Sequence, residues 1–339
     1  MIGVGHFLLL VGLLVGVHEA GHFLASLACG VRVREIGLGL PPRLGRIGTW
    51  RGTTFTFNVL PLGGFILPEG EFDRSQVRGF AAATARRRAT ILAAGPAANL
   101  LLAYLLFALA FALGAPDQVR IVGVDPDSPA EQSGLRAGDV VTRVDGRVVR
   151  TAEELRTIVK SSLDQPLRLA IERDGQERLL TLTPHLGWSA DGQAAGFESI
   201  GEIVRYAPGA ALVRASQQII GSARAVPGIP GTPENAEARL VGIVGMKRIA
   251  DRALHNSLDW GRPFPVLFVA ASLSLALGVT NLLPLPGLDG GRLMLLSPEL
   301  WFRLRLSDRL ERRLNAAGVI GLLGLMVLLA IRDLADPLL

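Results

Sequence analysis

The chain has 339 residues, 49% of them hydrophobic, and a formal net charge of +5 at pH 7. Its mean hydropathy is +0.38, and its apolar residues gather in a few long runs, which is typical of a membrane protein and not of a soluble core. Lys160 and Lys247 are the only lysines. Arginine beside apolar spans suits an anionic membrane surface, so we expect membrane lipid and no nucleic acid as a partner. Cys29 is the only cysteine, which excludes an intrachain disulfide.

Four apolar stretches are long enough to cross about 30 Å of hydrocarbon as helices. They lie near residues 4–28, 90–114, 264–283 and 316–332. Loops 30–89 and 290–315 carry ten and six arginines, so we expect both loops in the cytoplasm and both termini outside. The segment between the second and third spans then also lies outside, because long domains translocate largely regardless of charge. The first span carries ionisable residues and no basic n-region, so we expect it to stay in the mature protein.

The first span contains His18-Glu19-Ala20-Gly21-His22, an H-E-x-x-H pattern within a helical apolar run. The two imidazoles lie one turn apart on one helix face, where both can bind one metal ion, and Glu19 lies beside them as a general base. Ionisable groups in a membrane helix cost at least about 2.5 kcal/mol each. The pattern therefore indicates a functional site, with zinc as the cofactor and peptide-bond hydrolysis as the chemistry.

A catalytic zinc ion usually has three protein ligands, and we expect Asp289 to be the third. It follows the point where Pro284 and Pro286 break the third span, at the boundary predicted to face the cytoplasm. Asp-Gly is also a common turn sequence, so Asp289 alone would indicate only a turn. Because the zinc motif is present, we favour Asp289 as a zinc ligand over Asp289 as a turn residue. We expect the remaining histidines to be structural or surface residues: His6, His185 and His255.

Together these residues resemble the site-2 protease family of intramembrane metalloproteases, in particular its bacterial RseP-like branch, which carries a PDZ domain outside the membrane. The first span matches the family's H-E-x-x-H. The third span matches its N-x-x-P-x-P-x-L-D-G pattern at Asn281, Pro284, Pro286 and Asp289. The resemblance implies that Asp289 binds zinc and that Asn281 binds the substrate backbone. It also implies that the substrates are single-span membrane proteins, such as trimmed anti-sigma factors or remnant signal peptides.

Residues 53–66 alternate like a hairpin strand and resemble the family's membrane re-entrant β-loop. A transmembrane helix must unwind before hydrolysis, and its freed amides need partners that hydrocarbon does not offer. The resemblance therefore implies that Gly63, Gly64 and Phe65 hold the substrate by strand addition. The alternative is an ordinary hairpin in a cytoplasmic loop.

The second span contains Gly95-Pro96-Ala-Ala-Asn99, which also matches a family pattern. Small residues allow helices to approach closely, and an amide can form hydrogen bonds across helices. We expect Gly95 and Pro96 to serve helix packing.

Residues 118–185 resemble a PDZ domain of the bacterial protease type, through Ser128-Pro-Ala-Glu-Gln-Ser-Gly134 and Gly138-Asp139. Such domains bind extended chain ends by strand addition, so peptide C-termini are expected partners. The alternative is a steric spacer, and we favour a domain that excludes untrimmed substrates. The segment that follows contains an amphipathic run through Ile249, Leu254 and Trp260 and is expected to lie on the outer membrane surface.

We therefore expect a multi-pass α-helical membrane protein of the bacterial cytoplasmic membrane, with about four transmembrane helices, a re-entrant β-loop and an inserted small α/β PDZ domain. The expected segments are 1–29 (first span), 30–89 (cytoplasmic loop with the hairpin), 90–115 (second span), 118–185 (PDZ domain), 186–263 (amphipathic linker), 264–289 (third span), 290–315 (cytoplasmic loop) and 316–333 (fourth span).

Two other functions fit parts of this sequence. A non-catalytic PDZ-bearing membrane adaptor would need no intact zinc motif. A polytopic transporter could use the broken third helix as a midplane site, but four spans without a repeat make a transporter a poor explanation.

We expect regulated intramembrane proteolysis with the active site toward the cytoplasm.

Overall fold

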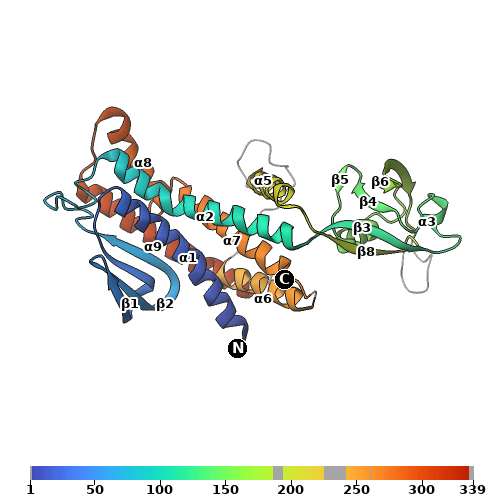
Figure 1. The fold of residues 1–339 in the computed structure, drawn as a ribbon, viewed down its shortest axis with the longest axis horizontal. Helices are drawn as coiled ribbons and strands as arrows, with labels where there is room; N and C mark the ends of the chain where they lie inside the picture. Colours follow the sequence, from blue (N-terminus) through green and yellow to red (C-terminus); the bar gives the residue numbers. More distant parts are fainter. Residues whose placement is uncertain (1, 186–193, 225–241, 260, 336–339) are drawn as a thin grey trace. The chain divides into compact units, whose positions relative to one another are not determined.

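The computed structural model describes residues 2–185, 194–224, 242–259 and 261–335. The chain divides into two compact units (Figure 1). The membrane unit comprises residues 1–110 and 208–339, and the inserted unit comprises residues 111–207.

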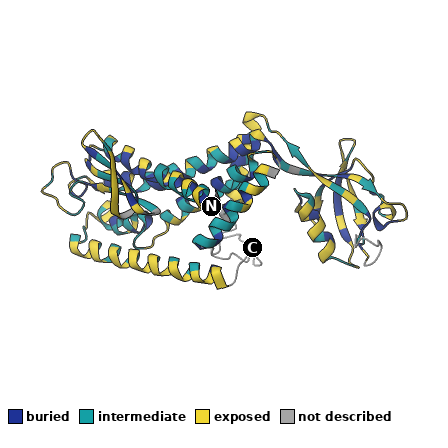
Figure 2. Cartoon of the chain, turned by 90° about the horizontal axis from the view of Figure 1, so that it is seen from below, coloured by how far each residue is buried: buried dark blue, intermediate teal, exposed yellow. Residues whose placement is uncertain are grey.

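Among the described residues of the membrane unit, four helices are long and apolar enough to cross a membrane. They are α1 (Ile2–Ala28), α2 (Ala85–Leu113), α7 (Phe264–Leu282) and α9 (Asp308–Ala335). Many of their large apolar side chains are exposed, such as Leu9 at 76% and Ile320 at 71%. Figure 2 shows the exposed residues of the chain in yellow. Apolar surface of this extent is suited to lipid and not to water. The predicted multi-pass helical class is confirmed.

The helix boundaries differ from the predicted ones where apolar sequence and helix do not coincide. Helices α2 and α9 begin at residues 85 and 308, before the predicted 90 and 316, because arginine-rich turns extend both helices beyond their apolar part. Helix α7 ends at Leu282, shortly before Pro284, whose missing N–H and ring stop a helix. The expected cytoplasmic loop 290–315 is largely helical, since α8 covers Asp289–Phe302.

A long hairpin follows α1. Its strands β1 (Val33–Trp50) and β2 (Thr53–Pro68) pair antiparallel, and the turn between them has positive φ at Arg51 and Gly52, as a tight two-residue hairpin turn requires. The first residues of β1 pair with both ends of β2. Ile36, for example, has Ile66 as its partner on one side and Phe55 on the other. Strand β2 also contacts α1, which brings the hairpin against the helix that carries the zinc motif.

The inserted unit has an antiparallel sheet in the order β7-β6-β4-β3-β8, with β5 paired to β4. Its strands are β3 (Ala115–Val124), β4 (Val140–Val144), β5 (Arg147–Val148), β6 (Leu167–Arg173), β7 (Gln176–Leu182) and β8 (Phe197–Val204). Two helices complete the unit: α3 (Pro129–Gln132) and α4 (Ala152–Ser161). Ile121, Leu155 and Leu169 lie at the centre of one apolar core. This is the expected small α/β domain.

The inserted domain is longer than the predicted 118–185. Strand β8, which we had expected in the linker, pairs with β3 from Ala115 opposite Val204 to Val124 opposite Phe197. The prediction ended too early because the Gly-rich stretch after residue 185 interrupts the strand pattern. Nothing in the local sequence shows that the chain returns to the sheet.

The rest of the expected linker 186–263 contains α5 (Pro208–Arg224) and α6 (Ile243–Asp259). The expected amphipathic helix is α6, although Trp260 lies outside the described residues. Its Ala250 packs with Phe7 and Leu10 of α1 and Ala270 of α7. An apolar face of α6 therefore packs against two spanning helices and does not face lipid alone.

Candidate metal centre

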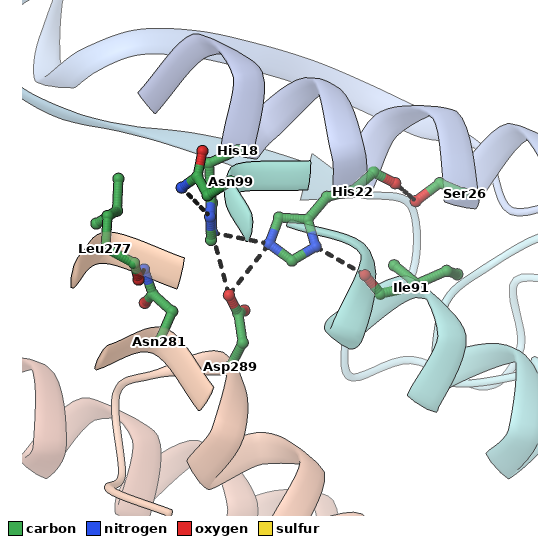
Figure 3. A network of polar contacts seen from close by, with 8 residues as sticks. All are labelled: His18, His22, Ser26, Ile91, Asn99, Leu277, Asn281 and Asp289. Carbon is green, nitrogen blue, oxygen red and sulfur yellow. Dashed lines mark hydrogen bonds and ion pairs between the residues drawn. The ribbon is translucent and has the colours of Figure 1, made fainter. Parts of the chain in front are cut away.

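Three candidate ligands from distant parts of the chain converge beside α1 (Figure 3). His18 and His22 lie one turn apart on α1, and Asp289 is the first residue of α8. Asp289 Oδ2 is 3.1 Å from His18 Nε2 and 3.2 Å from His22 Nε2, and the two Nε2 atoms are 3.1 Å apart. All three groups are at least 85% buried, since the exposed side-chain fractions are 10%, 7% and 15%.

This triangle fits a zinc ion. Ligand atoms about 2.0–2.2 Å from a tetrahedral zinc are about 3.3 Å from one another, and His and Asp are among its usual ligands. Two imidazoles and a carboxylate buried together are costly unless they are paired or bind a metal. Among the described residues this is the group of His, Cys, Asp and Glu side chains close enough to hold an ion. Three protein ligands leave a fourth position for water or substrate.

The turn that presents Asp289 depends on glycine. Beyond Leu282 the chain turns through Pro284 and Pro286 and re-enters helix at Asp289. A Cβ on Gly290 or on Gly291 would lie closer than 3.0 Å to the carbonyl oxygens of Leu282 and Leu285, respectively. Only glycine therefore allows α8 to start this close to the end of α7.

Glu19 is 9% exposed and directly follows His18 on α1. Strand β2 passes directly against it, because a Cβ on Gly64 would lie 3.0 Å from Glu19 Cγ and 2.7 Å from Val15 Cγ1. The structure thus brings Gly64 to the centre together with the zinc motif. Gly63 has φ +107°, a conformation that favours glycine.

Two of the predicted substrate-binding residues have other contacts. Phe65 lies against β1, where it occupies the space that a side chain on Gly37 would need. The Asn281 amide donates to the Leu277 carbonyl, 3.1 Å away, one turn back on α7 (Figure 3).

Helix α2 contributes groups that we did not predict as part of the site. His22 Nδ1 donates to the Ile91 carbonyl at 2.7 Å, and Asn99 Nδ2 lies 3.2 Å from His18 Nδ1. A Cβ on Gly95 would lie closer than 3.0 Å to His22 Nε2. Gly95 therefore serves packing as expected, but against the imidazole. A backbone carbonyl has no identity in the sequence, so no pattern could have indicated Ile91.

Comparison with known proteins defines the class. Residues 6–325 match Peptidase family M50. The chain belongs to this family, as the resemblance to site-2 proteases predicted, and is a membrane zinc metalloprotease.

The relatives align over almost the whole chain. Cj1068 of Campylobacter jejuni, provisionally named a zinc metalloprotease, is 29% identical and covers 96% of this chain and 92% of its own. CPE1693 of Clostridium perfringens, named in the same way, is 30% identical and covers 96% of both chains. Metalloprotease MmpA of Caulobacter vibrioides is 29% identical and covers 98% and 96%. Among solved structures, the PDZ domain of the SdrC-like protein of Listeria innocua covers 26% of this chain and 100% of its own, with 18% identity and a TM-score of 0.23.

The close approach of Gly95 to His22 leads to a prediction. Gly95→Ala should lower zinc affinity by about tenfold or more, because the added methyl group displaces an imidazole whose position the metal requires. The measurement is zinc affinity of the purified full chain by competition with a chelator. Gly321→Ala is the matched control, since a Cβ at that position in α9 meets nothing within 4 Å. Equal affinity for the Gly95 variant and wild type would contradict the packing argument.

Proposed function

We propose that this metalloprotease cleaves single-span membrane proteins within or at the edge of the bilayer, at a zinc ion held by His18, His22 and Asp289. The observation that supports the proposal most strongly is that Asp289, at the start of α8, meets His18 and His22 on α1, a helix long and apolar enough to span a membrane. A non-catalytic adaptor would gain nothing from burying two imidazoles and Glu19 in such a helix, with the Asp289 carboxylate against them.

Zinc, when bound, supplies a Lewis acid that polarises the scissile carbonyl and lowers the pKa of water to about 7. The protein supplies the rest. Glu19 accepts the proton of the attacking water and delivers it to the leaving amine, which breaks the peptide bond without a covalent intermediate. Glu19 is buried and follows His18 directly on α1, which supports this role, since a general base must lie within hydrogen-bond reach of the water.

The hairpin is the proposed substrate platform. Within the described residues β1 and β2 form a two-stranded sheet, so a further strand can add to it. An unwound substrate segment needs partners for its amides, and Gly64 lies where such a strand would meet Glu19. This contact favours a substrate-holding hairpin over an ordinary loop. We propose that Gly63 and Phe65 belong to the same platform and that Asn281 binds the substrate backbone.

The cellular role follows from the family resemblance. We propose regulated intramembrane proteolysis in the bacterial cytoplasmic membrane, with the active site toward the cytoplasm and the inserted domain outside. Trimmed anti-sigma factors and remnant signal peptides are the two proposed substrate groups. In the inserted domain, the edge strand β8 offers backbone groups to a peptide C-terminus.

Substitutions at the metal centre should separate metal binding from proton transfer. Glu19→Gln should abolish cleavage and keep about one zinc ion per chain, because Glu19 moves protons and does not bind the metal. His22→Ala and Asp289→Ala should lose both zinc and cleavage, since a three-ligand site rarely survives loss of a ligand. Metal analysis and cleavage of a single-span substrate check this. Full zinc occupancy in Asp289→Ala would mean that another residue is the third ligand.

The proposed orientation can be checked by labelling cysteines in a Cys29→Ala background. Arg46, Ser307 and Arg147 are exposed. Cysteines at Arg46 and Ser307 should react with an impermeant thiol reagent only from the cytoplasmic side, and a cysteine at Arg147 only from outside. Labelling of Arg147→Cys from the cytoplasm would reverse the orientation.

Removal of the inserted domain should distinguish exclusion from recruitment. Ala115 and Val204 are ladder partners, about 5 Å apart, so a short Gly-Ser linker can replace residues 115–204 entirely. Removal of 118–185 alone would leave β8 without its sheet. We expect the deletion variant to cleave a substrate with an intact ectodomain, whereas wild type cleaves only the trimmed form. Confinement to one membrane already raises effective concentration, so recruitment matters less.

The comparison uses both substrates with both enzymes at matched zinc content. A deletion variant that is slower on the trimmed substrate and no faster on the intact one would show recruitment in place of exclusion.

A further inference from the structure

We propose that α2 holds both zinc-binding imidazoles in position, and that Asn99 is the positioning residue for His18 by accepting a hydrogen bond from its Nδ1–H. The inference rests on the proposed ligand set. It concerns a fully buried residue, since Asn99 is 0% exposed, and a buried side-chain amide in a membrane helix is costly unless its hydrogen bonds are made.

The geometry at Asp289 determines where the ring protons lie. Both histidines direct Nε2 toward Asp289 Oδ2 (Figure 3). A nitrogen that binds a metal carries no proton, so the neutral imidazole must keep its proton on Nδ1. Each Nδ1–H then needs an acceptor. A metal-binding histidine almost always has one, and it fixes both the tautomer and the orientation of the ring.

For His22 the acceptor is already in place. The Ile91 carbonyl lies 2.7 Å from His22 Nδ1, and a carbonyl oxygen has two lone pairs, so it can accept this bond in addition to one within the helix. Gly95 lies one turn further along α2 and leaves room for the ring.

For His18 the group within reach is Asn99. Its Nδ2 lies 3.2 Å from His18 Nδ1, and its Oδ1 is buried without a hydrogen-bond partner. In this orientation two N–H donors face each other, which forms no hydrogen bond. Oxygen and nitrogen of an amide have nearly the same shape, and their assignment follows from the hydrogen-bond network. Rotation of the amide by about 180° places Oδ1 toward the Nδ1–H of His18. The amide nitrogen then occupies the place where Oδ1 had no hydrogen-bond partner. The bond to His18 decides between the two orientations.

The spacing along α2 supports one common role. Ile91, Gly95 and Asn99 follow one another at intervals of four residues, so they lie on one face of the helix. That face presents one acceptor to each histidine, with the glycine between them. The Ser274 hydroxyl of α7 donates to the Asn99 backbone carbonyl at 2.8 Å, which ties this part of α2 to a third helix.

The experiment measures zinc affinity of the purified full chain by chelator competition. Asn99→Leu keeps the size of the side chain but accepts no hydrogen bond, so it should weaken zinc binding about 10–100-fold. Asn99→Asp keeps an oxygen acceptor at the same place and should stay within about threefold of wild type. Ser274→Ala removes the bond between α7 and the Asn99 backbone and controls for looser helix packing. Ser272→Ala is the matched neutral variant, since the Ser272 hydroxyl donates to the Phe268 carbonyl of its own helix.

Three results would overturn the inference: wild-type affinity in Asn99→Leu, equal loss in Asn99→Asp and Asn99→Leu, or equal loss in Ser274→Ala and Asn99→Leu. The second would mean that the amide acts as a donor or by its packing, and the third that helix packing accounts for the effect. The proposed ligand set is tested separately in the same assay. It fails if wild type binds no zinc or if His22→Ala keeps wild-type affinity, whatever the Asn99 variants do.

Discussion

Hydrocarbon offers no hydrogen-bond partner, so every polar group that a membrane helix carries must find its partner inside the protein. In this chain the constraint acts on His18 and His22, which lie deep in α1 and are 8% and 5% exposed. Their partners come from three other places: Asp289 at the start of α8, and the Ile91 carbonyl and Asn99 amide on α2. The metal centre is therefore also a packing centre, because moving any of these helices would leave a polar group unpartnered.

Close helix approach at this centre depends on small residues. A Cβ on Gly21 of α1 would lie closer than 3.0 Å to the Ala94 carbonyl and to Ala98 of α2. On the other side of α2, a Cβ on Gly278 of α7 would lie 3.1 Å from the Pro96 carbonyl. Lipid tails are as apolar as leucine, so the hydrophobic effect does not drive spanning helices together. Close packing contacts of this kind, and hydrogen bonds between the helices, hold them together instead.

Much of this centre could be predicted from the sequence, because its parts are local patterns. The H-E-x-x-H spacing predicts two imidazoles on one helix face, and the break at Pro284 predicts a helix end beside Asp289. What could not be predicted depends on contacts between segments distant in the sequence. The return of β8 to the sheet and the contact of Gly64 with Glu19 both follow from pairing and packing. Local periodicity does not encode them.

The fourth span is connected to the site in a similar way, although it carries no candidate ligand. No residue in the apolar part of α9 is buried, yet at Gly318 the helix meets the turn that leads to Asp289. A Cβ on Gly318 would overlap the Pro286 carbonyl, and one on Gly287 would lie 2.7 Å from the backbone nitrogen of Val319. Two of the three proposed ligands, His18 and His22, lie on α1 itself, whereas the third, Asp289, depends on a non-helical turn that α9 contacts at Gly318. The position of Asp289, and with it the completeness of the candidate metal centre, therefore depends on how α9 packs, so a helix that is largely exposed in the structure takes part in forming the proposed site.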